Sequence, residues 1–133
     1  MTLSESGSHL KLAKKRILVA DDRATSRELV RTALERSGYD VSEAVDGRDA
    51  LEQIRTNAPD LVILDLHMPV VDGYEVVREI RLDTRLRELR VVALTASAME
   101  GDRQKALGAG FDGFLTKPLS LASLRKELAG LLS

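Results

Sequence analysis

The sequence predicts an α/β fold in which a doubly wound, five-stranded parallel sheet carries helices on both faces. Two features predict this: short aliphatic runs recur along the chain, and segments with helical periodicity separate them. The predicted strands cover residues 17–20, 41–44, 61–64, 91–94 and 113–115. Strands this apolar need cover on both faces, and strands that alternate with helices form parallel sheets with right-handed crossovers. The expected architecture is therefore a βα unit repeated five times.

The predicted helices follow the strands in order. The first has four apolar residues spaced to share one face: Leu29, Val30, Ala33 and Leu34. Thr25 and Glu28 have the spacing of a capping box at its start, and Gly38 fits its end. Two apolar groups indicate the next two helices: Ala50, Leu51 and Ile54, then Val76, Val77 and Ile80. A fourth helix is expected around residues 99–109, and a fifth over residues 121–131 with Ser120 as its N-cap.

Composition is typical of a soluble, single-domain protein. The chain has 133 residues, 44% of them hydrophobic, and its net charge of −1 gives no basic footprint for direct nucleic-acid binding. The absence of cysteine excludes disulfides, thiolate metal sites and a cysteine nucleophile. No apolar run approaches the roughly 18 residues of a membrane span. We therefore expect a cytoplasmic protein with a flexible N-terminal arm at residues 1–14 and one domain at residues 15–133.

Polar residues follow four of the five predicted strands. Asp21 and Asp22 follow the first strand, Asp65 the third, Thr95 the fourth and Lys117 the fifth. Because the carboxyl ends of parallel strands share one edge of the sheet, these side chains are expected to converge there. The alternative for Asp21 and Asp22 is a cap on the first helix, and the alternative for Thr95 is an ordinary strand position.

Three neighbouring carboxylates require a compensating positive charge. At 4 Å and an effective dielectric constant near 20, each pair repels by about 4 kcal/mol. Oxygen ligands without cysteine predict Mg²⁺ as the cation, and Lys117 supplies a second positive charge. A metal, a lysine and a threonine hydroxyl around one carboxylate are suited to phosphoryl transfer, in which the carboxylate itself becomes an aspartyl phosphate.

The motifs at these strand ends resemble those of the receiver domain of two-component response regulators, in particular single-domain, chemotaxis-regulator-like receivers. The resemblance rests on Asp21-Asp22, DLHMPVVDG at residues 65–73, Thr95-Ala96 and FLTKP at residues 114–118. It covers residues 15–133, and all four motifs occur in order at strand ends. It implies the flavodoxin-like strand order 2-1-3-4-5.

The resemblance implies a phosphoacceptor and a metal site. Asp65 would accept the phosphoryl group, and Asp22 and Asp65 would bind Mg²⁺ directly through their carboxylates. Asp21 would bind the ion through a water molecule, and the backbone carbonyl of His67 would be another ligand. The side chain of His67 is expected at the rim of the pocket, where it would modulate dephosphorylation together with Ser97.

The same resemblance implies a conformational switch. Lys117 would pair with the phosphoryl oxygens, and Thr95 would swing its hydroxyl toward them. Phe114 would turn inward when Thr95 moves, although plain core packing is the other role for an isolated aromatic residue. Pro118 would follow a cis peptide bond that aims Lys117.

Asp72 and Gly73 allow two interpretations, a structural turn or part of a second acidic site. Asp72 and Gly73 are expected to form a turn that shapes the loop after Asp65, rather than a second acidic site. In this interpretation Gly73 supplies backbone freedom.

The resemblance also implies the partners. The phosphoryl donor would be the phosphohistidine of a sensor histidine kinase or a histidine phosphotransfer protein, because the only histidines here are His9 and His67 and neither lies on a predicted helix. Output is expected through the face formed by the helix around residues 99–109, the fifth strand and the last helix. That face would bind a downstream protein, or a second copy in a phosphorylation-dependent homodimer. Such a protein is its own phosphorylation substrate rather than an enzyme.

Two alternatives stay open at this point. The chain is either a stand-alone regulator or a receiver module excised from a hybrid histidine kinase or a larger response regulator. A haloacid-dehalogenase-type phosphatase also forms an aspartyl phosphate after a strand, but it needs a second Asp two residues later, where this chain has His67. P-loop kinases and dinucleotide-binding proteins are excluded because their glycine motifs are absent.

Overall fold

One parallel sheet organises the computed structural model, which describes residues 14–97 and 99–132. The strand order is β2-β1-β3-β4-β5, and all pairs are parallel. The strands are β1 (Arg16–Ala20), β2 (Asp40–Ala44), β3 (Leu61–Asp65), β4 (Arg90–Thr95) and β5 (Gly113–Thr116). The predicted fold class and strand order are confirmed, and each strand extends one or two residues beyond its predicted bounds.

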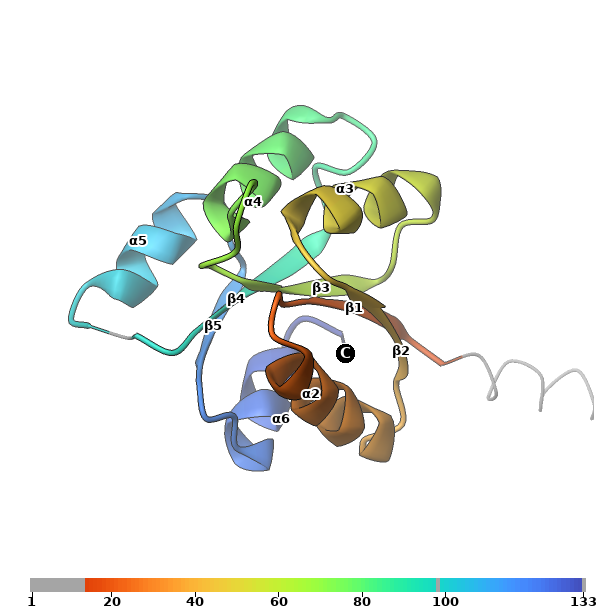
Figure 1. Cartoon of the computed structure of the whole chain (residues 1–133), viewed down its shortest axis with the longest axis vertical. Coiled ribbons are helices and arrows are strands. Elements are labelled where there is room, and N and C mark those ends of the chain that lie inside the picture. The colour runs from red at the N-terminus through yellow and green to blue at the C-terminus, as the bar shows by residue number, and fades with distance from the viewer. Residues whose placement is uncertain (1–13, 98, 133) are drawn as a thin grey trace, which may run out of the picture.

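Five helices cover the two faces of this sheet. They are α2 (Ala24–Arg36), α3 (Gly47–Thr56), α4 (Gly73–Leu82), α5 (Asp102–Gly108) and α6 (Leu121–Ala129). Figure 1 shows α3, α4 and α5 on one face and α2 and α6 on the other. No helix in the described part of the chain is both long enough and apolar enough to cross a membrane. Residues 1–13 of the expected N-terminal arm lie outside the described residues, so its boundary stays a prediction.

The strands are buried on both faces, as their apolar sequences predict. Successive side chains of a strand point to opposite sides, so Leu18 and Ala20 pack under α3 and α4 while Ile17 and Val19 pack against α2 and α6. All five residues of β3 are buried. Each large aliphatic side chain buried in this way contributes about 1.5–3 kcal/mol of transfer free energy. The resulting two-sided core makes the sheet a firm platform for the residues that follow its strands.

Three helices begin with the side-chain cap that their sequences suggest. Asp46, Asp72 and Ser120 each accept a hydrogen bond from the backbone N–H three residues later. This confirms Ser120 as the cap of α6. It also makes Asp72 the cap of α4, in agreement with its expected place in a turn.

The start of α2 differs from the prediction. Helix α2 begins at Ala24 with Arg23 as its N-cap, and no side-chain cap is present there among the described residues, so the expected capping box of Thr25 and Glu28 is wrong. The helix starts directly after the turn that ends β1, which places Thr25 inside the helix. Leu29 is 68% exposed and does not share the buried face of Val30 and Leu34.

Candidate functional site

The register of the sheet brings the predicted acidic residues together. Ala20 of β1 lies opposite Leu64 of β3, so the residues that follow them, Asp21 and Asp65, are neighbours at the carboxyl edge. Asp21, Asp22 and Asp65 each offer a carboxylate oxygen, and these oxygens all lie within 4.8 Å of one another. Asp21 and Asp65 are buried and Asp22 is exposed. The expected convergence of the three carboxylates is confirmed.

Lys117 completes the cluster from the end of β5. Its Nζ lies 2.9 Å from Oδ2 of Asp21 and 2.9 Å from Oδ2 of Asp65. Its backbone N–H donates to the carbonyl oxygen of Thr95 at 2.8 Å, which ties the residue to the end of β4. The bond between Lys117 and Pro118 is cis, as predicted. The ammonium of Lys117 therefore contacts two of the three carboxylates, those of Asp21 and Asp65.

The two buried carboxyl groups respond differently to this environment. Burial raises the pKa of Asp65, and the hydrogen bonds from Lys117 and the His67 amide only partly offset that effect. Burial also acts to raise the pKa of Asp21, but hydrogen bonds from Ser26 and the Arg23 amide, together with the positive charge of Lys117, outweigh it and hold this pKa below its usual value. For Lys117, burial opposes the charged form, yet the two carboxylates raise its pKa.

The donor atoms fit a hard divalent cation. Oδ1 of Asp21 accepts a hydrogen bond from the Arg23 amide at 2.9 Å. Among the described residues, the buried Oδ2 of Asp21 accepts no hydrogen bond, and its charged neighbour is the Lys117 ammonium at 2.9 Å. Because this one ammonium is shared between Asp21 and Asp65, the buried carboxylates keep an excess of negative charge that a further cation would offset. An all-oxygen ligand set with such an excess of charge is typical of a Mg²⁺ site.

The loop after β3 shapes the pocket around Asp65. The His67 amide donates to Oδ1 of Asp65 at 2.9 Å, while the His67 side chain is exposed at the rim. A side chain at Gly73 would come within 2.6 Å of the Asp65 carbonyl oxygen. Gly73 is therefore needed for close approach, and this is a more specific reason than the backbone freedom that we expected. Val70 has a φ of 68°, an uncommon conformation for a β-branched residue, and its side chain is exposed.

Among the described residues, neither Thr95 nor Phe114 forms a hydrogen bond with the side chains of Asp21, Asp22 or Asp65. Thr95 is fully buried, and its hydroxyl donates to the Ser97 carbonyl at 3.3 Å and accepts from the Ser97 amide at 3.2 Å. Phe114 is buried in the core under α4 and α5. Ser97 is exposed near the end of β4. The roles expected for Thr95, Phe114 and Ser97 stay predictions.

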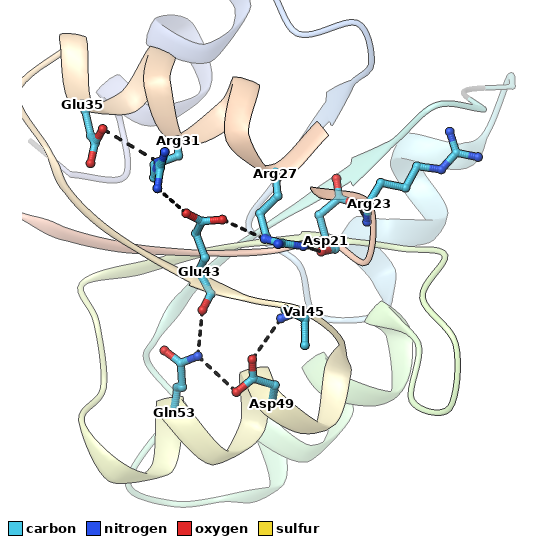
Figure 2. A network of polar contacts seen from close by, with 9 residues as sticks. All are labelled: Asp21, Arg23, Arg27, Arg31, Glu35, Glu43, Val45, Asp49 and Gln53. Atoms are coloured by element: carbon cyan, nitrogen blue, oxygen red, sulfur yellow. Dashed lines mark hydrogen bonds and ion pairs between the residues drawn. The ribbon is translucent and has the colours of Figure 1, made fainter. Parts of the chain in front are cut away.

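Two residues next to the pocket were missed from the sequence. Nη1 of Arg27 donates to the backbone carbonyl of Asp21 at 2.8 Å, and Nε of Arg27 pairs with Oε1 of Glu43 at 2.8 Å. Figure 2 shows this network on the β1, β2 and α2 side of the site. Arg27 and Glu43 are far apart in the sequence, so hydrophobic periodicity does not indicate that their side chains are in contact. Only the pairing of β1 with β2 would have indicated that they meet.

Comparison with known proteins agrees with the geometry of the site. A family model for the response regulator receiver domain matches residues 17–129. The receiver domain of sensor histidine kinase PA1611 from Pseudomonas aeruginosa PAO1 was solved with a magnesium ion coordinated in its active-site cleft. It is 34% identical to this chain with a TM-score of 0.81, covering 91% of this chain and 100% of that one.

Curated relatives differ in how much of their length they share with this chain. The sensor protein EvgS of Escherichia coli O157:H7 is 42% identical over 118 residues, which are 89% of this chain but 10% of EvgS. The polar-differentiation response regulator DivK of Brucella anthropi is 34% identical over 107 residues, which are 80% of this chain and 87% of DivK. The chain thus spans between a tenth and half of the length of the first relatives it matches, and most of the length of DivK.

Proposed function

The chain belongs to the response regulator receiver family, and we propose that Asp65 accepts a phosphoryl group from a partner phosphohistidine in a Mg²⁺-dependent reaction. The family is one of phosphoacceptor signalling domains rather than of enzymes. One observation carries the assignment to Asp65: it is a buried carboxylate with two acidic neighbours and Lys117 at 2.9 Å, at the carboxyl edge of the sheet. Asp22 is exposed, and at Asp21 burial is outweighed by hydrogen bonds and by Lys117, which lower its pKa, whereas burial raises the pKa of Asp65.

The residues of the pocket have distinct parts in the proposed transfer. A carboxylate oxygen of Asp65 attacks phosphorus, the P–N bond to the donor imidazole breaks, and its electron pair stays on the imidazole nitrogen. Lys117, already within 2.9 Å of Asp65, is placed to bind an oxygen of the transferring group and to offset its charge. The His67 amide holds the Asp65 side chain through its hydrogen bond to Oδ1. Hydrolysis of the acyl phosphate later returns the free carboxylate and inorganic phosphate.

The metal assignment follows from the same contacts. The carboxylates of Asp22 and Asp65, a water molecule held by Asp21, and the backbone carbonyl of His67 would hold Mg²⁺. When bound, the ion neutralises the acidic cluster and the phosphoryl oxygens. The Asp21 oxygen without a hydrogen bond and the magnesium reported in the PA1611 receiver support this assignment.

The proposal includes the partners. Family membership implies a histidine kinase as the source of phosphoryl groups, and we infer that it acts directly or through a histidine phosphotransfer protein. The stand-alone and the embedded forms of this proposal correspond to DivK, 87% of which the matched region covers, and to EvgS, 10% of which it covers. A cytoplasmic location and a domain over residues 15–133 complete the proposal.

The proposed output face is formed by α5, β5 and α6. Oε1 of Glu127 on α6 accepts the Phe114 amide at 2.8 Å, and Arg103 of α5 pairs with Glu127 at 3.1 Å. Phe114 is thereby connected to α6 directly and to α5 through Glu127 and Arg103. We infer that a movement of Thr95 that displaces Phe114 would change the conformation of this face. A downstream protein or a second copy of the chain would bind there, with no direct role for nucleic acid.

Intact mass is the most direct test. We expect the protein incubated with Mg²⁺ and acetyl phosphate to gain one phosphoryl group, and the Asp65→Asn variant to gain none. Asp72→Asn is a matched control in the same loop, because asparagine also caps α4. A chain that gains no phosphoryl group, or an Asp65→Asn variant that gains as much as the parent, contradicts the proposal.

A further inference from the structure

Arg27 lies outside the acidic pocket but holds the turn that carries two of its carboxylates. Its Nη1 donates to the carbonyl oxygen of Asp21 at 2.8 Å, and its side chain is only 14% exposed. We propose that Arg27 is a positioning residue for Mg²⁺ binding, which acts by fixing the directions of the Asp21 and Asp22 side chains. This inference rests on the proposed function, because it concerns the same metal site.

The geometry of the peptide unit explains how one hydrogen bond orients two side chains. The Asp21 carbonyl belongs to the planar unit that joins Asp21 to Asp22, so a restraint on its oxygen fixes the rotation of that plane. The Asp21 amide already donates to the Ala44 carbonyl at 3.2 Å, and Oδ1 of Asp21 accepts from the Arg23 amide at 2.9 Å. The Arg27 contact restrains the remaining polar group of Asp21. It does so at a helix start where the described residues provide no side-chain cap.

Glu43 holds Arg27 in place from the neighbouring strand. Its Oε1 pairs with Nε of Arg27 at 2.8 Å, and its Oε2 pairs with Nη1 of Arg31 at 2.6 Å. The Glu43 carbonyl accepts from Nε2 of Gln53 on α3 at 2.8 Å, so this end of β2 is also anchored (Figure 2). Because two nitrogens of the Arg27 guanidinium are bound, its rotamer is fixed even without a metal ion. Outer groups of this kind commonly change metal affinity by about 10–100-fold.

Arg31 offers a matched comparison within the same network. It is one helical turn further along α2 and binds the same Glu43 carboxylate. Within the described part of the chain it makes no hydrogen bond or ion pair with the Asp21–Asp22 turn, and its other ionic neighbour is Glu35 at 3.9 Å. Loss of Arg31 removes an ion pair from Glu43 and leaves the Asp21 carbonyl held. The pair Arg27→Met and Arg31→Met therefore separates control of the turn from general loss of charge.

The test measures Mg²⁺ affinity without phosphorylation. Backbone amide NMR shifts of the full chain are followed as MgCl₂ is added to the parent protein and to each variant, and urea unfolding checks the fold. We expect Arg27→Met to weaken Mg²⁺ binding about tenfold and Arg31→Met to change it less than twofold. Equal affinities for Arg27→Met and the parent, or equal losses in both variants, would overturn the inference.

The same titration distinguishes failure of the inference from failure of the proposed function. A parent protein that binds no Mg²⁺ contradicts the proposed function, whereas a parent that binds and an Arg27→Met variant that binds as well contradict only the positioning role. If Arg27→Met does not fold, Arg27→Lys replaces it. Lysine cannot reach both the carbonyl and Glu43 as the guanidinium does, so we expect a loss of about threefold against none for Arg31→Lys.

A double variant tests whether Glu43 acts through Arg27. Glu43→Gln alone should weaken Mg²⁺ binding by less than Arg27→Met, because Arg27 keeps its carbonyl partner. If Glu43 acts only by orienting Arg27, adding Glu43→Gln to Arg27→Met should weaken binding no further. Full additivity of the two losses would contradict this route.

Discussion

Both edges of the sheet hold charged side chains. At the amino edge these side chains are hydrogen-bonded to the protein, and at the carboxyl edge they form an acidic cluster. At the amino edge, Arg81 of α4 donates five hydrogen bonds of 2.6–2.9 Å, to the carbonyls of Gly110, Arg87 and Leu89 and to Asp112. At the carboxyl edge, the ammonium of Lys117 contacts Asp21 and Asp65, and Asp22 offers a third carboxylate oxygen within 4.8 Å of theirs. At the amino edge Asp112 pairs with two arginines, Arg81 and Arg90. At the carboxyl edge one ammonium is shared by two carboxylates with a third close by, so this edge carries an excess of negative charge.

This difference shows which edge stabilises the fold and which is built for a ligand. Asp112 also accepts the Val91 amide at 2.8 Å, so its cluster joins the starts of β4 and β5 to the end of α4. The acidic pocket instead contains a buried Asp21 oxygen with no hydrogen bond among the described residues. Repulsion that persists in the folded protein is relieved by a cation or by neutralisation of one carboxylate. Stability and phosphoryl chemistry should therefore separate between the two edges.

Removal of Arg81 should have the largest effect on stability. Arg81→Met loses the five hydrogen bonds and leaves Asp112 without its closest cationic partner, so we expect the free energy of unfolding to fall by about 2–4 kcal/mol. Urea unfolding measures this change. Phosphorylation by acetyl phosphate, measured below the unfolding midpoint, should keep the parent rate. A variant that unfolds like the parent would remove the distinction between the edges.

Arg85 is the control for that measurement. It lies in the same stretch of chain, but its side chain is 71% exposed, and Asp83 is its one ionic partner within the part of the chain that the structure describes. Arg85→Met should change the free energy of unfolding by less than about 0.5 kcal/mol.

Removal of Lys117 should give a smaller effect that depends on Mg²⁺. In EDTA, Lys117→Met leaves three carboxylates without their cation, and we expect stability to fall by about 1–2 kcal/mol. Because the pKa of Lys117 is raised, its contribution is fully present below the ordinary lysine pKa of 10.5 and is lost as pH rises through the raised value. Measurement at pH 7.5 therefore captures the whole effect.

Mg²⁺ should restore more stability to this variant than it adds to the parent, because the ion no longer competes with the ammonium. Phosphorylation should be slower, since the group that faces the phosphoryl oxygens is gone. Lys126→Met, at an exposed position on α6, is the control. A variant that gains nothing from Mg²⁺ would contradict the view that lysine and metal share one pocket.

The sequence predicted the sheet and its acidic edge because both follow from local signals. Aliphatic runs reveal buried strands, and the parallel arrangement then brings Asp21, Asp65 and Lys117 to one edge without further information. The helix cap at Ser120 was predicted for the same reason, since its side chain bonds only three residues away.

The features that the sequence did not reveal depend on tertiary structure. Glu43 and Arg27 meet because β2 pairs with β1, and the alternation of β2 gives no sign of it. Val70 has a positive φ that its own conformational preference opposes, so no local rule would place it there. Leu29 is apolar and exposed, and helical periodicity alone assigned it to the wrong face.

The smallest predicted effect compares two aspartates inside the pocket. The pKa of Asp65 is raised in the folded protein, so its charge opposes folding above that raised pKa, and Asp65→Asn should increase stability in EDTA at pH 7.5 by about 1 kcal/mol. The gain should fade as pH decreases through the raised pKa toward the ordinary 3.8, because the carboxyl of the parent is then neutral. Asp21 has a lowered pKa, so its charge favours folding above pH 3.8 and that contribution is lost as pH falls through the lowered value.

Asp21→Asn should therefore decrease stability at pH 7.5, although it lies in the same cluster and receives the same change. Urea unfolding of both variants in EDTA between pH 3 and pH 8 measures the two signs. If both substitutions change the free energy of unfolding in the same direction at pH 7.5, the pocket is a uniform patch of negative charge. If stability changes in opposite directions, hydrogen bonds and Lys117 outweigh the burial of Asp21, whereas burial outweighs the same kinds of contact at Asp65, the proposed phosphoacceptor.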